Sequence, residues 1–242
     1  MLSKSKAIVL HAIKYSESSV IAYCYTQHFG KISFLVQGVR KKNAHIKFNQ
    51  LQPLQVNDID FYYKEKHGLM RIKDLRSCHI ADELLFETQK STIALFLSEI
   101  LYKTLKEEIK NNDQFLFIEN NIAMLNNLEN GFVAFYIKFL VDYSLYLGFY
   151  PNTDDQANSG FFDLRNGIFL KNQPAHEFYI SGELLKIFEA FLNSDERQIY
   201  QQKISNIMRN NLLNTILDYY MLHMDGFTNL QSLNVLRDLF HG

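Results

Sequence analysis

Residues 31–42 read KISFLVQGVRKK and join a strand-like pattern to a run of basic residues. In its first half, Ile32, Phe34 and Val36 alternate with other side chains and therefore fall on one face, as a half-buried strand requires. In its second half, Gly38 is followed, one residue later, by three consecutive cations. This segment therefore predicts a β-strand that is followed directly by a basic loop.

Four further segments of the first eighty residues have the composition of strands. They are residues 7–10, 20–26, 58–63 and 69–75. The last of them follows the turn signal His67-Gly68. Five short strands with one long basic loop and no helical period predict a small β-barrel, for which the five-stranded oligonucleotide-binding (OB) fold is the leading candidate. A five-stranded SH3-like barrel fits the same pattern.

From about residue 82 the hydrophobic period changes to three and four residues, which predicts amphipathic helices. The chain has only 10 Gly and 3 Pro in 242 residues, which favours long regular elements. Asp113 and Ser181 are the expected N-caps of two of the helices, and Gly148 is the expected end of another. The predicted helices span residues 93–105, 114–128, 132–147, 182–192, 199–224 and 228–240.

An irregular insert at about residues 151–181 interrupts the helices. It holds two of the three prolines, and Asn166-Gly167 between two apolar runs is a strong signal for a β-hairpin. The predicted fold class is therefore α+β. A five-stranded OB-fold barrel occupies residues 1–80, and a mostly α-helical domain that contains the insert occupies residues 81–242.

Net charge divides the chain at the same place. Over the whole chain, 25 Lys and Arg oppose 26 Asp and Glu, a formal net charge of −1. Residues 1–80 hold 13 basic and 5 acidic side chains, a net charge of +8, whereas residues 81–242 hold 12 and 21, a net charge of −9. This asymmetry predicts a polyanion such as nucleic acid as the partner of the first part, and a different partner for the second.

The basic segment after residue 37 is the candidate nucleic-acid interface, because each phosphate neutralised by a clustered cation releases counterions. The candidate DNA-binding residues are Arg40, Lys41, Lys42, Lys47, Lys31, Lys6, Arg71 and Lys73, with Lys4, Lys14, His45 and Arg76 adding charge nearby. Aromatic side chains lie between these cations and could stack on bases, although for any single ring we favour a place in the barrel core. They are Tyr23, Tyr25, Phe34, Phe48, Tyr62 and Tyr63.

No motif for catalysis or for a cofactor stands out. Gly30-Lys31 lacks the other residues of a phosphate-binding loop. No two of the eight histidines are three or four residues apart, so the usual metal-ligand spacings are missing. Asp58 and Asp60 could hold a metal in a nuclease, but this spacing is common and no third acid is nearby. We therefore predict a protein that is not an enzyme, with no catalytic residue, metal or cofactor.

The distribution of apolar residues also predicts a location. The first fifteen residues carry four Lys and His side chains, which leaves no apolar run of the kind found in signal peptides. The most apolar later stretch, residues 132–141, contains Lys138 and is far too short to cross a membrane. We expect a soluble protein of the cytoplasm that has no membrane partner.

The order of several motifs resembles the RecO family of bacterial recombination mediators. In the first part these are residues 6–11, 15–19 and 25–26, Gly30-Lys31, the basic G-x-R turn within residues 36–42, and residues 48–54 with their L-x-P-L motif. In the last part they are Arg209, Tyr219-Tyr220, His223, Gly226-Phe227 and residues 230–233. The resemblance covers nearly the whole chain and is most specific in the first eighty residues.

The resemblance implies an N-terminal OB domain and a C-terminal helical domain. It further implies recombinational repair by the RecF pathway, in which a member binds single- and double-stranded DNA, anneals complementary strands and helps to load the RecA recombinase together with RecR. Single-stranded-DNA-binding protein is a second implied partner, and the implied location is the bacterial cytoplasm, at the nucleoid when acting. Arg40, Lys41 and Lys42 are the positions to which the DNA-binding role of the basic OB surface carries over.

Two other functions fit the residues. One is a protein–protein adaptor whose barrel is not a nucleic-acid platform, which salt-insensitive association with a protein partner would favour. The other is an RNA-binding OB protein, which a preference for RNA over DNA of equal length would favour.

Many members of the resembled family carry a four-cysteine zinc module, built as two Cys-x-x-Cys pairs, in the region that matches residues 151–181. This chain has no cysteine there, and His176 alone cannot form a tetrahedral site. We therefore predict a metal-free version, whose hairpin is held by Phe161, Phe162, Ile168 and Phe169. Metal analysis of the purified protein should find no bound zinc, whereas one zinc ion per chain would contradict this prediction.

Overall fold

The computed structural model describes residues 1–41, 43–64, 68–107, 109–200 and 204–240. These residues form two compact units, Met1–Leu128 together with Leu230–Phe240, and Glu129–Asn229. The sequence-based boundary between residues 80 and 81 marks the place where strands give way to helices. As a statement about domains it stays a prediction.

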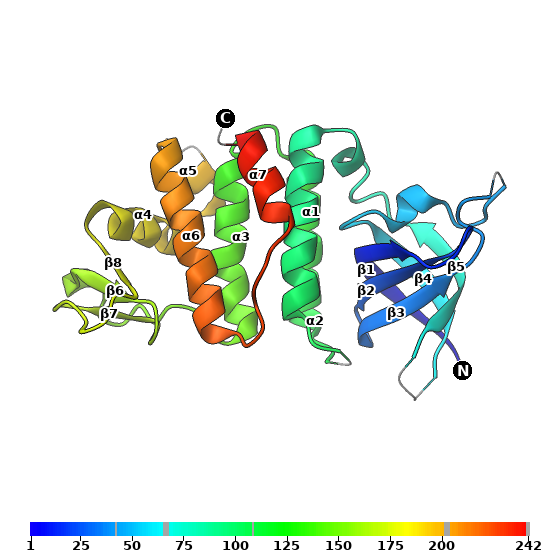
Figure 1. The fold of residues 1–242 in the computed structure, drawn as a ribbon, viewed down its shortest axis with the longest axis horizontal. Helices are drawn as coiled ribbons and strands as arrows, with labels where there is room; N and C mark the ends of the chain where they lie inside the picture. Colours follow the sequence, from blue (N-terminus) through cyan, green and yellow to red (C-terminus); the bar gives the residue numbers. More distant parts are fainter. Residues whose placement is uncertain (42, 65–67, 108, 201–203, 241–242) are drawn as a thin grey trace. The chain divides into compact units, whose positions relative to one another are not determined.

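Five strands of the first unit form a closed barrel (Figure 1). They are β1 (Leu2–Lys14), β2 (Val20–Thr26), β3 (Gly30–Val36), β4 (Val56–Tyr62) and β5 (Met70–Ser77). Their order around the barrel is β1-β2-β3-β5-β4, in which β3 and β5 run parallel and the other neighbours antiparallel. This is the topology of the OB fold, so the predicted fold class is confirmed over the SH3-like alternative.

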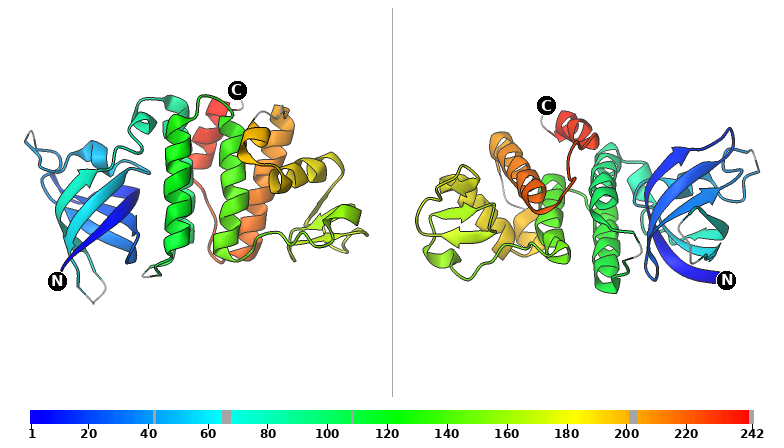
Figure 2. Two further views of the ribbon diagram at one scale, coloured as in Figure 1. Left: turned by 180° about the vertical axis from the view of Figure 1, so that it is seen from behind. Right: turned by 60° about the horizontal axis from the view of Figure 1, so that its bottom comes forward.

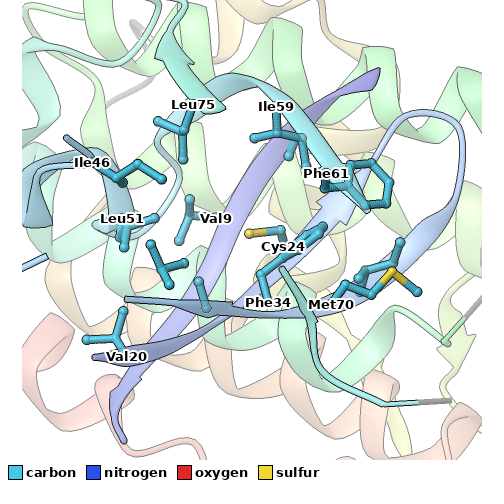
Figure 3. Close-up of a cluster of buried hydrophobic side chains, with 14 of the residues drawn as sticks. Val9, Val20, Cys24, Phe34, Ile46, Leu51, Ile59, Phe61, Met70 and Leu75 are labelled. Atoms are coloured by element: carbon cyan, nitrogen blue, oxygen red, sulfur yellow. The ribbon is translucent and has the colours of Figure 1, made fainter. Parts of the chain in front are cut away.

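Alternation of side chains along these strands builds the barrel core (Figure 3). Ile32, Phe34 and Val36, which were predicted to share one face, are all buried, and so are Ile59 and Phe61 on β4. The rings of Phe34 and Phe61 meet edge to face with their centroids 5.2 Å apart. Burial of these apolar surfaces, at about 25 cal/mol per Å² removed from water, is the main term that stabilises the barrel.

Three α-helices and two short 3-10 turns complete the described part of the first unit. They are η1 (Phe48–Leu51), η2 (Glu83–Leu85), α1 (Thr88–Thr104), α2 (Asn112–Asn127) and α7 (Ser232–Phe240). The N-cap of α2 is Asn111, whose side chain accepts a hydrogen bond from the Gln114 backbone N–H, and the predicted cap, Asp113, is wrong. Asn111 is the last residue with extended backbone angles before the helix, and only a residue in that conformation can act as the cap.

The C-terminal helix α7 belongs to the first unit because Glu99 of α1 holds its start. The Glu99 carboxylate accepts hydrogen bonds from the backbone N–H groups of Gln231 and Ser232, at 2.9 and 2.8 Å, and from the Ser232 hydroxyl. It thereby satisfies N–H groups that a helix N-terminus leaves without partners. Burial raises the pKa of Glu99, but the hydrogen bonds from Ser232 and Gln231 outweigh it and hold this pKa below its usual value.

The second unit combines helices with a small sheet (Figure 1). Its elements are α3 (Phe132–Leu147), η3 (Gln156–Asn158), β6 (Phe161–Asp163), β7 (Ile168–Leu170), β8 (Tyr179–Ser181), α4 (Gly182–Asn193), α5 (Glu196–Tyr200) and α6 (Asn206–His223). The helix predicted for residues 132–147 is confirmed to the residue. It ends at Gly148, whose φ of +86° is a conformation that glycine adopts with little strain.

The single helix predicted for residues 199–224 is wrong, because the chain forms two helices there. α5 ends at Tyr200 and α6 begins at Asn206. Ser205 has an extended backbone, and its side chain accepts a hydrogen bond from the Met208 N–H, so it starts a new helix. Residues 201–203 lie outside the described residues. No helix within the described ranges is long and apolar enough to cross a membrane.

The predicted hairpin at Asn166-Gly167 is formed by β6 and β7, and β8 adds a third strand that the sequence pattern did not predict. Phe162 and Phe169 face each other across the hairpin and are buried, with ring centroids 4.8 Å apart. Phe161 and Ile168 are only half-buried. Two of the four side chains expected to hold the hairpin therefore form its inner layer.

The Asp163 carboxylate connects the parts of this small sheet. It is buried and accepts hydrogen bonds from the backbone N–H groups of Arg165 and Asn166, from the Asn166 side chain and from the His176 ring, at 2.7–3.3 Å. Burial raises the pKa of Asp163, but the Asn166 and Arg165 hydrogen bonds reverse this and hold it below its usual value. In the described part of the chain, no three His, Cys, Asp or Glu side chains form a group that could hold a metal ion.

We predict that Asp163→Ala destabilises the second unit by about 1.5–3 kcal/mol, because it removes hydrogen bonds to a buried charged group. The ionised Asp163 contributes this stability above its unfolded-state pKa of about 3.9, and the contribution is lost as the pH falls through the lower folded-state pKa. Urea denaturation at pH 7 and at lower pH measures the difference in the free energy of unfolding. The matched control is Asp154→Ala, at an exposed aspartate of the same insert. Equal stability of the two variants at pH 7 would contradict the prediction.

Candidate nucleic-acid interface

The basic loop, residues 37–47, connects β3 to the 3-10 turn η1 (Phe48–Leu51) and is held to the barrel at two points. Val39 and Ile46 are buried in the barrel core cluster, at opposite ends of the cationic segment. Figure 3 shows Ile46 and Leu51 pointing into the same cluster as Val9 and Leu75. Gly38 has a φ of +75°, which a residue with a side chain rarely adopts, and it turns the chain out of β3.

Strand β5 lies beside this loop. Arg71 pairs in parallel with Leu35, which lies two residues before the loop begins. From there β5 continues past the end of β3. The His45 ring of the loop lies 3.0 Å from the Asp74 carboxylate of β5. Lys73 is the extra residue of a β-bulge, because Asp60 and Phe61 of β4 pair with Asp74 and Ile72. Figure 2 shows the loop, in light blue, extending beyond the barrel strands.

Five of the eight predicted DNA-binding residues lie in this region with exposed side chains. They are Arg40, Lys41, Lys47, Arg71 and Lys73. Among the described residues, none of the five has a carboxylate partner within 4.0 Å. The Arg40 guanidinium lies over the Phe48 ring, 5.8 Å from its centroid. Lys42, a sixth predicted residue, lies outside the described residues.

Ion pairs balance the neighbouring cations on the outer surface of β1, β4 and β5. Asp60 lies between Lys4, at 3.7 Å, and Arg76, at 3.9 Å. Asp74 lies between Arg76, at 3.6 Å, and His45, and the His45 hydrogen bond is the first cause that lowers the Asp74 pKa. Asp60 and Asp74 thus pair with Lys4 and Arg76, whereas the five described cations of the loop and β5 named above have no carboxylate partner.

Lys6, another predicted residue, instead holds a helix to the barrel. Its ammonium lies 2.7 Å from the carboxylate of Glu119 on α2, which is buried. The hydrogen bond with Glu119 raises the pKa of Lys6 above its usual value. Nothing in a single sequence links two residues 113 positions apart, so this role was missed.

Lys31 is engaged in the same way with the end of α1. Its ammonium donates a hydrogen bond to the Tyr102 backbone carbonyl, at 3.1 Å, and lies 5.1 Å from the centroid of the Tyr102 ring. Burial lowers the pKa of Lys31, against the opposing effect of the Glu107 carboxylate. Lys6 and Lys31 are therefore not brought together with the cations of the basic loop.

Some of the aromatic residues that lie between the cations in sequence are buried, and others are exposed. Tyr25 and Phe34 are fully buried, and the Tyr25 hydroxyl lies 3.0 Å from the Gln114 side-chain oxygen of α2. Tyr23 meets Tyr102 edge to face, with centroids 5.2 Å apart. Tyr63 packs on Phe29 and Phe61. Phe48 and Tyr62 are exposed, and of these two Phe48 belongs to η1, directly after the basic loop.

Comparison with known proteins agrees with the barrel and its helical continuation. Residues 1–81 match the family described as Recombination protein O N terminal, and residues 85–232 match Recombination protein O C terminal. The chain is 35% identical to the DNA repair protein RecO of Phocaeicola vulgatus and to that of Bacteroides fragilis, and 32% identical to that of Flavobacterium psychrophilum. Each alignment covers 99% of this chain and 100% of the relative.

We predict that Lys6 and Glu119 are coupled in folding. A double-mutant cycle with Lys6→Ala and Glu119→Ala should give about 0.5–1 kcal/mol of coupling in the free energy of unfolding. Because the folded-state pKa of Lys6 is raised above its unfolded value of about 10.4, the coupling is complete below that pH and is lost as the pH rises through the folded-state pKa.

The control for this cycle is Lys4→Ala on the same strand, since the Lys4 side chain is mostly exposed and its ion pair is long. We expect Lys4→Ala to change stability less than Lys6→Ala does. Zero coupling between Lys6 and Glu119 at pH 7 would contradict the structural role of this ion pair.

Proposed function

Because this chain belongs to the RecO family of DNA repair proteins, we propose that it is a non-catalytic protein that binds single- and double-stranded DNA through its basic loop and β5. The observation that supports this proposal is the group of five exposed cations, Arg40, Lys41, Lys47, Arg71 and Lys73, without carboxylate partners in the described part of the chain. Lys42 continues the same run of sequence and is included in the proposed interface.

The chemistry of this surface favours contact with phosphates over reading of base sequence. Lys and Arg side chains neutralise phosphates and release counterions, which gives affinity without sequence information. Arg40, Lys41 and Lys47 lie on a loop whose Val39 and Ile46 side chains are buried in the barrel core, and Arg71 and Lys73 lie on β5. Such a surface holds the sugar-phosphate backbone and leaves the Watson–Crick edges of a single strand free.

Strand annealing follows from these properties. Two complementary strands repel each other, and a surface that neutralises phosphates on both lowers this repulsion and raises their local concentration. The base edges stay free to find partners, so pairing proceeds with no covalent step. We propose that RecR and single-stranded-DNA-binding protein are the protein partners, and that the protein works in the cytoplasm at the nucleoid to help load recombinase on DNA.

We predict that the double variant Arg40→Glu/Lys41→Glu weakens binding of single- and double-stranded oligonucleotides alike, whatever their sequence. Loss of two phosphate contacts should make the slope of log K against log salt concentration less negative by about 1.4 on single strands. Fluorescence anisotropy of labelled oligonucleotides across a salt series measures both effects, and an annealing assay should show slower pairing.

The matched control is Lys171→Glu/Lys186→Glu, which makes the same change in net charge at two exposed positions of the second unit. We expect the control to keep most of its affinity. Equal affinity of the Arg40/Lys41 variant and the native protein at moderate salt would contradict the proposed interface. Tighter binding of RNA than of DNA of equal length would favour an RNA-binding function instead, and salt-insensitive binding of a protein without DNA retention would favour an adaptor.

A further inference from the structure

Phe86 is exposed to an unusual degree for a large apolar side chain. It follows η2 and is 84% exposed, and among the described large hydrophobic residues only Met1, at the start of the chain, is more exposed. The preceding Leu84 is buried, so the turn is anchored in the first unit while Phe86 points to solvent. An apolar ring held in this way is available to a ligand.

Phe86 lies at a cavity of about 400 Å³ that also borders the proposed DNA-binding surface. This volume is within the range of roughly 300–1,000 Å³ that is typical of small-ligand sites. Lys47, Asn49 and the two histidines His45 and His79 also line the cavity. Lys47 is one of the unpaired cations, so the cavity is continuous with the basic loop.

The acidic groups around Phe86 are already paired with bases. The Asp82 carboxylate lies 2.8 Å from the His79 ring. Glu83 and Glu87, three residues before and one residue after Phe86, both bind the buried ammonium of Lys90, at 3.2 and 3.0 Å. Lys47 is left as the charged group of the cavity wall that has no ion-pair partner among the described residues. A phosphate can therefore approach from the side of the basic loop.

We propose that this cavity receives one unpaired base of a single-stranded nucleic acid, which stacks on the Phe86 ring while Lys47 contacts its phosphate. The proposal rests on the proposed function, because it needs DNA on the basic loop. Stacking on an aromatic ring is tolerant of sequence, since every base has a π-face. The exposed Asn49 amide offers a donor and an acceptor to the edge of the base.

The charge next to Phe86 favours a nucleic acid over an apolar protein segment as the occupant. A docking protein would have to cover the exposed Lys47 along with the ring, and burial of an unpaired charge is costly. A nucleotide presents an apolar face and an anionic phosphate side by side, which matches Phe86 and Lys47. In a duplex the faces of the bases are stacked inside the helix, so the subsite distinguishes single strands from double strands.

The test compares single- and double-stranded oligonucleotides of equal length on the full chain. Phe86→Ala should weaken binding of single-stranded oligo(dT) by about 5- to 150-fold and change duplex affinity less than twofold. Phe86→Tyr, which keeps the ring, should bind both within twofold of the native protein. Because Phe86 is so exposed, we expect the melting temperature to be nearly unchanged in both variants.

A direct readout is available because the chain contains no tryptophan. Phe86→Trp places a single tryptophan at the subsite, and its fluorescence should be quenched by saturating oligo(dT) but not by a duplex. Leu145→Trp, at an exposed position of α3, is the control and should not respond.

Three outcomes would overturn the proposal: unchanged oligo(dT) affinity in Phe86→Ala, equal losses for single strands and duplexes, or loss of binding to a protein partner alone. Failure of the proposed function can be told apart from failure of the Phe86 subsite. If the proposed function is wrong, Arg40→Glu/Lys41→Glu will not change the affinity for single- or double-stranded DNA.

Discussion

The attachment of the basic loop to the barrel core positions the cations of the proposed interface. Val39 and Ile46 are apolar and enter the core cluster, while Arg40 and Lys41 between them are exposed to water. Without these two anchors, a run of like charges would be expected to separate and move freely, because repulsion favours extended chains. The hydrophobic effect therefore holds positive charges together at one end of the barrel, next to Arg71 and Lys73 of β5.

The outer surface of β1, β2 and β3 has a different use. Lys6, Tyr25 and Lys31 form hydrogen bonds or ion pairs with residues of α2 or with the end of α1, so this surface is occupied within the first unit. The net charge of +8 over residues 1–80 consequently overstates the charge that DNA can meet. Lys6 binds a helix, Lys4 and Arg76 are balanced by Asp60 and Asp74, and five described cations without carboxylate partners lie on the loop and β5.

The sequence predicted those features that depend on neighbouring residues. β2 and α3 were placed to the residue, and the inward face of β3 was identified, because alternation and helical period are local signals. Five short strands made the OB fold the leading candidate beside an SH3-like barrel, and the strand order with the parallel pairing of β3 and β5 confirms the OB fold. The family resemblance was most specific in the same region, and the family is confirmed over residues 1–81 and 85–232.

Features that depend on distant residues could not be predicted. Glu119 lies 113 residues from Lys6 and Tyr102 lies 71 residues from Lys31, so their pairing leaves no periodic trace. β8 has only three residues and no alternation to recognise. Phe86 follows two leucines in sequence and was not singled out, and only the structure shows that Leu84 is buried and Phe86 is not.

Hydrogen–deuterium exchange of the full chain, with and without a saturating single-stranded oligonucleotide, shows where DNA binds. We expect protection on binding to be concentrated in described residues of the basic loop, η1 and β5, with little change in α2. Protection confined to α1 and α2 or to the second unit, with the exchange of the basic loop unchanged, would contradict this expectation.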